Sequence, residues 1–210
     1  FYTLSLHDAL PIDEDETPDA VIARGALQRE AAERDGRRCD VVAASQRVEP
    51  GALQRLDADA AARRLGEPRA SGGLWIGDGL VIEPRRVLDA WLGGCPRLDA
   101  EVHGVRRTPE DWEVLGPDGG VLASAEIVLI AGGHGSRRLW PELALEPVRG
   151  QASFADWGQR PQAAAWGGYV IPTRGGLLFG ATHDRGREDL GVVSADHARN
   201  LATLAQAWPA

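Results

Sequence analysis

The stretch EIVLIAGGHGSRRLWPELALEPVRGQ, which runs from Glu126 to Gln151, decides the fold. Residues 127–130 are apolar at every position, and their length and β-branching predict a strand over 126–131 that is enclosed between two layers. Gly132, Gly133 and Gly135 follow at the end of this strand. They leave the main chain bare, so a large flat ligand can approach it closely. The alternative is a tight strand-to-helix turn that needs a positive φ.

The residues before this stretch predict helices and short strands in alternation. Asp57 is a suitable N-cap and Gly66 a suitable C-cap for a helix between them. Pro84 begins a helix that ends at Leu92, before two glycines. Residues 30–45 are a third predicted helix, residues 20–29 a strand, and 73–82 two short strands around a Gly-Asp-Gly turn.

Short strand patterns dominate the second half of the chain. Residues 98–125 predict a three-stranded meander with a hairpin turn at 117–120, which leads into the buried strand. A second antiparallel group covers 147–155, 164–172 and 176–182, with a turn at 173–176. A last helix covers 195–207, with Ser194 as its cap. Blocks of strands and helices in this order predict an α/β plus α+β fold in two layers.

Composition narrows the class of protein. The 210 residues are 43% hydrophobic with 26 Gly and 13 Pro, which favours a turn-rich globular protein over a helical bundle. A net charge of −8 provides no long-range attraction for nucleic acid, although three arginine pairs (85/86, 106/107 and 137/138) are candidates for a local basic patch. Two isolated cysteines indicate reduced thiols in a cytoplasmic protein. No apolar run approaches the ~20 residues needed to cross a bilayer.

Six pieces of the chain, in this order, resemble one family. They are LDADAAARRLG (56–66), GGLWIGDGLVIEPRRVLDAWL (72–92), IVLIAGGHGS (127–136), PVRGQASF (147–154), GYVIP (168–172) and LLFGATHDRG (177–186). The family is the FAD-dependent amine oxidases of the D-amino-acid oxidase and glycine oxidase superfamily. AGGH and ATHDRG make the chain most similar to the C-terminal oxidoreductase domain of the MnmC type, which modifies a wobble uridine of tRNA.

The resemblance implies a fold, a cofactor and a division into domains. The fold would be a partial FAD-binding Rossmann-like domain with a glycine-oxidase-like antiparallel-sheet substrate domain. Residues 20–82 would be part of the substrate domain, 83–146 part of the FAD-binding domain with the meander, and 147–210 the rest of the substrate sheet. Val102, Ala131, Gly132, Gly133 and His134 would contact FAD.

The same resemblance, together with residue chemistry, singles out three catalytic candidates. Tyr169 matches a tyrosine that the family places beside the substrate; the alternative is a tyrosine packed on the sheet. Arg149 precedes Gly-Gln in a strand, where its planar fork suits a carboxylate, and a structural ion pair is the alternative. His183 and His134 would line the pocket, or else serve in packing. His103 and His197 have the pattern of surface positions. We expect no metal site, since adjacent His183 and Asp184 would point to opposite faces of a strand.

Both ends of the chain suggest that it is a fragment. Residues 2–12 read like a translated sequencing adapter, so we expect 1–19 to be artefactual or disordered; a genuine N-terminal arm is the alternative. No GxGxxG turn for a dinucleotide follows any strand. The family carries that turn upstream and a substrate-binding arginine downstream of the matching region. We therefore expect truncation at both ends.

The function implied is oxidation of a secondary amine C–N bond with FAD. The parent enzyme would remove the carboxymethyl group of 5-carboxymethylaminomethyl-2-thiouridine in tRNA, release glyoxylate and leave an amine for a fused methyltransferase. Two alternatives stay open. One is a glycine or D-amino-acid oxidase acting on a small amino acid. The other is an inert fragment that lacks the FAD pyrophosphate motif.

Overall fold

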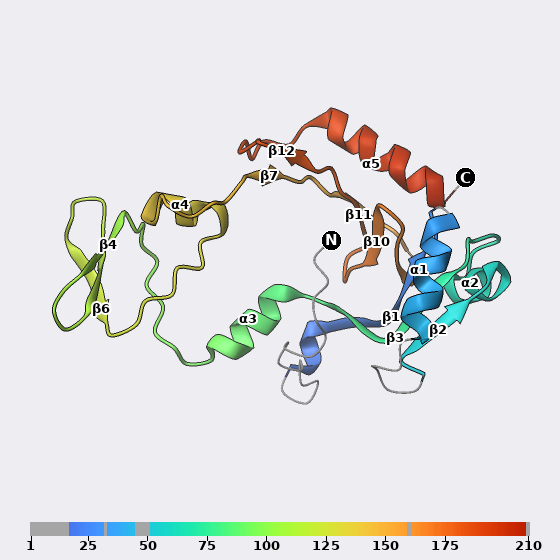
Figure 1. The fold of residues 1–210 in the computed structure, drawn as a ribbon, viewed down its shortest axis with the longest axis horizontal. Helices are drawn as coiled ribbons and strands as arrows, with labels where there is room; N and C mark the ends of the chain where they lie inside the picture. The colour runs from blue at the N-terminus through green and yellow to red at the C-terminus, as the bar shows by residue number, and fades with distance from the viewer. Residues whose placement is uncertain (1–16, 32, 45–50, 159–160, 209–210) are drawn as a thin grey trace. The chain divides into compact units, whose positions relative to one another are not determined.

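The structure is a computed structural model that describes residues 17–31, 33–44, 51–158 and 161–208. Most of the predicted N-terminal segment 1–19 therefore lies outside the described residues. The chain divides into two compact units, and Figure 1 labels most of their elements. The first, here called the sheet unit, comprises Phe1–Gly93, Gly150–His183 and Gly191–Ala210. The second, the meander unit, comprises Gly94–Arg149 and Asp184–Leu190.

The sheet unit is built on a seven-stranded sheet in the order β2-β3-β1-β9-β10-β11-β8. Its strands are β1 (Val21–Arg29), β2 (Leu53–Leu56), β3 (Gly73–Ile82), β8 (Ser153–Ala155), β9 (Ala163–Ala165), β10 (Tyr169–Pro172) and β11 (Leu177–Gly180). Its helices are η1 (Pro18–Ala20), α1 (Glu33–Ala44), α2 (Ala58–Leu65), α3 (Pro84–Leu92) and α5 (Ser194–Ala207). All pairs are antiparallel except β1 with β9, which joins the two halves of the sheet in parallel.

One face of this sheet carries the hydrophobic core. A row of residues in register crosses five strands and is buried throughout: Leu27, Ala164, Val170, Phe179 and Ser153. Side chains of α2 (Ala61 and Leu65) and of α5 (Ala207) belong to the same core cluster. Because side chains alternate along a strand, burial of this row places its neighbours along each strand on the opposite face.

The helices follow their local signals closely. Asp57 caps α2, accepting a hydrogen bond from the Ala60 amide at 2.8 Å, and Gly66 ends it with φ +70°. The α3 bounds also agree with prediction, and α1 is shorter than predicted. The cap predicted for α5 is wrong. Ser194 is the first helical residue, and Val193 occupies the cap position without a side-chain hydrogen bond.

Residues 73–82 form one strand, not the two predicted. β3 pairs with β1 along its whole length, and the Gly-Asp-Gly segment is an irregularity in that pairing. Arg24 faces Leu80 and Ala26 faces Ile76, so β3 carries extra residues between the two pairs. A turn signal within a strand becomes a bulge when a long partner continues past it.

The meander unit contains the predicted three-stranded sheet β4-β5-β6. Its elements are β4 (Gly104–Arg107), β5 (Trp112–Leu115), β6 (Val121–Ala125), η2 (Gly133–Gly135), α4 (Ser136–Leu139), β7 (Val148–Arg149) and β12 (Asp184–Arg185). The predicted strand 147–155 is divided between the two units. β7 pairs with β12, and β8 pairs with β11 in the large sheet.

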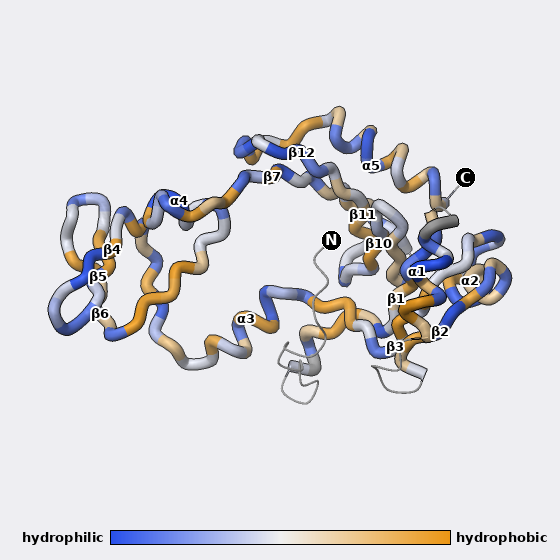
Figure 2. The backbone as a smooth tube through the Cα atoms, in the orientation of Figure 1, coloured by the Kyte–Doolittle hydropathy of each residue, from blue (hydrophilic) through white to orange (hydrophobic). Residues whose placement is uncertain are grey.

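The buried strand predicted over 126–131 is absent. These residues form no strand, and Ile127 and Leu129 are 77% and 87% exposed. Figure 2 shows the stretch as a hydrophobic tube between β6 and α4. A strand buried on both faces requires paired strands and covering layers. Among the described residues no strand pairs with this stretch, so its apolar pattern alone does not produce a strand.

Candidate functional site

The face of the large sheet opposite the core is the most suggestive surface of the sheet unit. We call it the open face and define it by residues that alternate with the core row: Ala26, Gln28, Phe154, Ala165, Tyr169, Ile171 and Leu178. Each of these is half-buried or exposed, whereas Ala163 on the same face is 5% exposed, and the set is mostly apolar. An apolar, partly exposed sheet face with a few polar groups is the composition expected of a small-molecule site.

Two polar side chains of the open face lie on one transverse row. Gln28 of β1 is in register with Ala165 of β9, and Ala165 with Tyr169 of β10. Strands are about 4.8 Å apart, so the main chains that carry Gln28 and Tyr169 are about 9–10 Å apart. Only a methyl group projects between them, and the next residue in the row, Gly180, has no side chain. The row therefore brings an amide and a phenol to the two sides of Ala165.

The hydrogen bonds and burial of these two residues define what they can do. The Gln28 amide donates from Nε2 to the Ala165 carbonyl at 3.2 Å, and its Oε1 accepts no hydrogen bond from the described residues. Burial raises the pKa of the Tyr169 phenol above its ordinary value. Tyr169 is therefore a neutral hydrogen-bond donor throughout the physiological pH range.

A buried polar network fastens the two motifs RGQ and GAT to α5. The main-chain N–H of Gln151 donates to Thr182 Oγ1 at 3.0 Å, and the main-chain N–H of Thr182 donates to the main-chain carbonyl of Gln151 at 3.2 Å. Asn200, which is 2% exposed, donates from Nδ2 to the Gln151 carbonyl at 2.8 Å and to Ser153 Oγ at 3.0 Å. Ser153 Oγ also lies 2.7 Å from His197 Nδ1. His197 is thus half-buried in this network, and its prediction as a surface residue is wrong.

The other two catalytic candidates have different surroundings. Arg149 is 8% exposed, and its Nε donates to the Asp189 carbonyl at 2.9 Å and lies 3.1 Å from the Asp189 carboxylate. The structural ion pair that the sequence left open is therefore present. His183 is exposed and follows Thr182 at the end of the GAT motif. Tyr169 and His183 belong to the sheet unit, whereas Arg149 belongs to the meander unit.

The candidate cofactor residues lie in the meander unit. Gly133 has φ +56°, and a Cβ built on it would meet no atom within 4 Å. The space beside Gly133 is therefore open, as the approach of a flat ligand to the main chain requires. The positive φ also agrees with the alternative, a tight turn that needs glycine. Ala131 and Gly132 are exposed, and Val102 is half-buried just before β4, which contacts α4. The Nε2 atom of His134 is buried without a hydrogen bond among the described residues and is 3.7 Å from Glu188.

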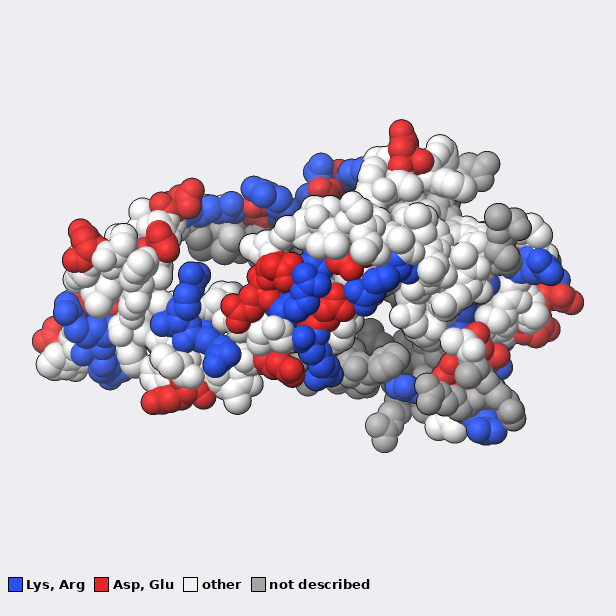
Figure 3. All heavy atoms as spheres, turned by 90° about the horizontal axis from the view of Figure 1, so that it is seen from above, with Lys and Arg blue, Asp and Glu red and all other residues white. Residues whose placement is uncertain are grey.

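Charge is interspersed over the surface. Figure 3 shows arginine and acidic side chains next to one another on the visible face. Arg86 pairs with Glu83 at 2.8 Å, and Arg106 pairs with Glu113. Arg137 and Arg138 are exposed and have no acidic partner among the described residues. Within the same residues, no helix has the length and hydropathy to cross a bilayer.

Sequence reasoning missed Gln28 and Asn200. The alternation of side chains along β1 could have placed Gln28 on the face opposite Leu27. Its partner on β9, Ala165, lies more than a hundred residues away in the sequence and could not be identified from it. Asn200 had no distinguishing signal within its helix, and its two acceptors, Gln151 and Ser153, are 49 and 47 residues away in the sequence. Both depend on long-range pairing.

Comparison with known proteins identifies the family. The family model described as "DAO: FAD dependent oxidoreductase" matches residues 7–210. The chain is 46% identical over 196 residues to the tRNA 5-methylaminomethyl-2-thiouridine biosynthesis bifunctional protein MnmC of Caulobacter sp. (strain K31). This alignment covers 91% of this chain and 32% of that protein. It is 44% identical over 209 residues to MnmC of Caulobacter vibrioides, covering 100% of this chain and 34% of that protein. The chain thus spans about a third of the length of these relatives.

Solved structures share the fold. Glycine oxidase from Geobacillus kaustophilus superimposes with a TM-score of 0.73 at 23% identity, over 92% of this chain and 57% of that chain. L-proline dehydrogenase from P. horikoshii gives a TM-score of 0.77 at 14% identity, over 93% of this chain and 59% of that chain. The predicted glycine-oxidase-like combination of α/β and antiparallel-sheet parts is confirmed, and so is FAD as the cofactor of the family. The chain belongs to the family of FAD-dependent oxidoreductases.

Proposed function

We propose that this chain is part of an FAD-dependent oxidoreductase that removes the carboxymethyl group of 5-carboxymethylaminomethyl-2-thiouridine in tRNA. The observation that carries the proposal is the 46% identity to an MnmC protein over 91% of the chain. The partner is the tRNA wobble uridine, and a cytoplasmic location goes with it. We also propose the division predicted above, in which 83–146 serve FAD binding and 20–82 with 147–210 serve the substrate.

The residues of the meander unit fit a dinucleotide. The Gly132–Gly133 main chain is exposed, and no side chain fills the space where a Gly133 Cβ would be. His134 Nε2 is a buried polar atom without a hydrogen bond among the described residues, which suits a polar ligand group. Val102, Ala131, Gly132, Gly133 and His134 are the residues we propose to hold the cofactor. When bound, the flavin supplies an acceptor for two electrons from the amine.

The open face fits a carboxymethylamine. Tyr169 keeps its proton on Oη because burial raises its pKa, so its phenol can donate a hydrogen bond to the substrate carboxylate. Gln28 Oε1, which accepts no hydrogen bond in the described part of the chain, can accept one from the substrate nitrogen. The apolar side chains around them, such as Ile171 and Leu178, exclude water from the bond that is oxidised.

The atoms balance as an oxidation followed by hydrolysis. The N–CH₂ unit of the substrate loses two electrons and two protons, and water then adds at that carbon. The products are the free amine and glyoxylate. The chain's role is to position the C–N bond, which needs no triad of acid and base residues.

The decisive experiment uses the full-length protein purified with its flavin. Glyoxylate release is measured from tRNA that bears the carboxymethylaminomethyl group and, separately, from free glycine. The proposal requires release from the tRNA; release from glycine alone would support an amino-acid oxidase instead. The visible spectrum of the 210-residue chain mixed with FAD tests whether these residues bind it by themselves.

A Tyr169→Phe variant of the same protein tests the open face. Loss of a hydrogen bond to a charged group costs about 1.5–3 kcal/mol, so kcat/KM for the tRNA should fall by about 10- to 100-fold. The control is Trp157→Phe, at a side chain that is 53% exposed and outside the set of residues that defines the open face, which should leave kcat/KM unchanged. Equal kcat/KM for Tyr169→Phe and the wild type would remove Tyr169 from the site.

A further inference from the structure

A cavity of about 300 Å³ lies in the sheet unit beyond the end of β1, and nothing in the proposed reaction uses it. It is bounded by four parts of the chain: the end of β1, the segment between α2 and β3, the β9–β10 turn and the last turn of α5. The lining residues are Arg29, Glu30, Ala31, Arg69, Ala70, Ser71, Trp166, Gln206 and Ala207. Its volume is at the lower end of the range for small-molecule sites.

A buried arginine with unused donors forms part of its wall. Arg29 is 5% exposed, and its Nη1 donates to both carboxylate oxygens of Glu67 at 3.0 and 3.2 Å. Its Nε and Nη2 make no hydrogen bond to the described residues. The Arg29 guanidinium also lies 6.0 Å from the centre of the Trp166 ring, at the outer limit of a cation–π contact. A buried guanidinium with unpaired N–H groups is suited to bind an oxyanion.

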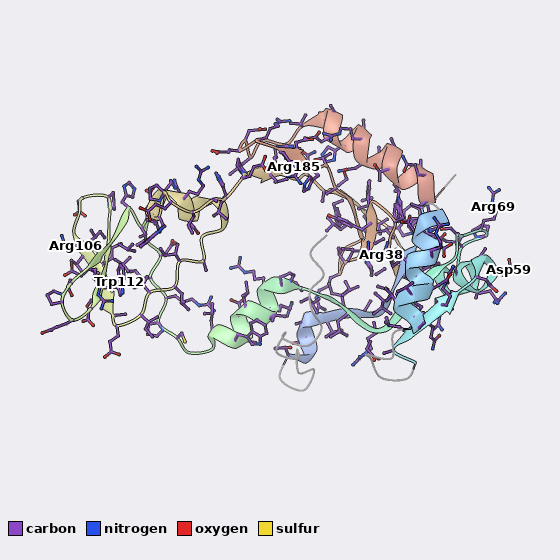
Figure 4. All side chains as sticks on the ribbon, in the orientation of Figure 1. Arg38, Asp59, Arg69, Arg106, Trp112 and Arg185 are labelled. Carbon is purple, nitrogen blue, oxygen red and sulfur yellow. The ribbon has the colours of Figure 1, made fainter. Side chains whose placement is uncertain are left out.

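The charged side chains that line the cavity are two arginines, Arg29 and Arg69, and one glutamate, Glu30. Arg29 forms an ion pair with Glu67, and Glu30 forms one with Arg55, which also pairs with Asp40. Arg69, at the rim, has no acidic partner among the described residues. Figure 4 shows its side chain extending outward from the segment between α2 and β3, where it can meet an incoming anion.

The remaining lining is mixed. Ala31, Ala70 and Ala207 contribute methyl groups, whereas Ser71 adds a hydroxyl and Gln206 an amide. The methyl groups accommodate a short hydrocarbon part, whereas the arginines require a charged head. We propose that this cavity binds a small organic monoanion, whose carboxylate or phosphate group contacts Arg29 and Arg69. The site is separate from the open face and does not depend on the proposed function.

The test follows the Trp166 indole N–H by NMR of the 210-residue chain. Trp166→Phe assigns its signal among the seven tryptophans. Sodium propionate and sodium phosphate are titrated separately, with sodium chloride at matched ionic strength as the control. The proposal requires a saturable shift with at least one of the two, and the arm that saturates identifies the head group. A shift that chloride reproduces is screening alone and overturns the proposal.

Three variants then locate the ligand. Arg69→Ala should weaken binding by about two- to fivefold, the range of an exposed ion pair. The double variant Arg29→Met with Glu67→Leu removes the buried pair together, which avoids an unpaired charge, and should abolish binding. Ala31→Phe fills the cavity at an exposed position and tests the site even if the double variant does not fold. Arg85→Ala is the control, because its side chain is 88% exposed on α3. Binding unchanged in Ala31→Phe refutes the site.

Discussion

Tyr169 shows how a single strand position sets the chemistry of a side chain. Side chains alternate along β10, and this alternation places Tyr169 on the open face. The residues beside it on the adjacent strands, Ala165 and Gly180, are small. The phenol is half-buried, and among the described residues no charged group shifts its pKa. Desolvation is accordingly the cause of its raised pKa.

This environment predicts an ultraviolet titration. Tyr2 is the only other tyrosine, so the difference between the wild type and Tyr169→Phe isolates one phenol. The difference should titrate above the ordinary value of ~10. Because the folded pKa lies above the unfolded one, the stability contributed by Tyr169 is complete below pH ~10 and decreases as pH rises beyond it. A difference curve centred at or below ~10 would show that Tyr169 is solvated.

At the scale of elements, one buried residue joins α5 to the RGQ segment and to β8. Asn200 is the donor that joins the helix to the Gln151 carbonyl and to Ser153 Oγ. Gly180 packs directly against it, since a Cβ there would lie 3.1 Å from the Asn200 side chain. The end of β11 and the middle of α5 therefore meet with no space for a larger residue.

Replacing Asn200 by Ala should lower the free energy of unfolding by about 2 kcal/mol, because two buried hydrogen bonds of about 1 kcal/mol each are lost. Urea unfolding followed by circular dichroism measures it. The matched control is Leu201→Ala on the same helix, where the side chain is 57% exposed and the change should stay within about 0.5 kcal/mol. Equal effects of the two substitutions would mean that α5 is not docked through Asn200.

Helices and strands were predictable to different degrees for a physical reason. The α2 bounds follow from Asp57 and Gly66, because capping involves residues within one or two turns. β3 and the stretch 126–131 were mispredicted because a strand depends on its partners. Because β3 pairs with β1 on both sides of its Gly-Asp-Gly segment, it continues as one strand. Residues 126–131 have no paired strand among the described residues.

At the scale of the whole molecule, apolar residues are distributed unevenly between the units. The sheet unit buries a continuous core around Leu27, Trp75 and Val170. The meander unit leaves Ile127 and Leu129 largely exposed. Hydrophobic stabilisation is therefore concentrated in the sheet unit, since it scales with the apolar area removed from water.

A pair of leucine substitutions tests this distribution. Leu27→Ala, at 1% exposure, should lower the free energy of unfolding by about 3 kcal/mol, within the range for buried leucines. Leu129→Ala, at 87% exposure, should change it by less than about 0.5 kcal/mol. Denaturant midpoints and light scattering of both variants provide the comparison. Destabilisation by Leu129→Ala would show that the 127–130 stretch is packed in solution.

The sequence by itself determined the family, the capped helices, the hairpins and the glycine turn, because each rests on nearby residues or on the order of motifs along the chain. Only the tertiary structure decided the single β3 strand, the row of Gln28 and Tyr169, the pairing of Arg149 with Asp189 and the cavity beside Arg29. Each of these joins residues that are far apart in sequence, and which of them meet depends on strand register. A shift of one residue in register would move every side chain of a strand to the other face.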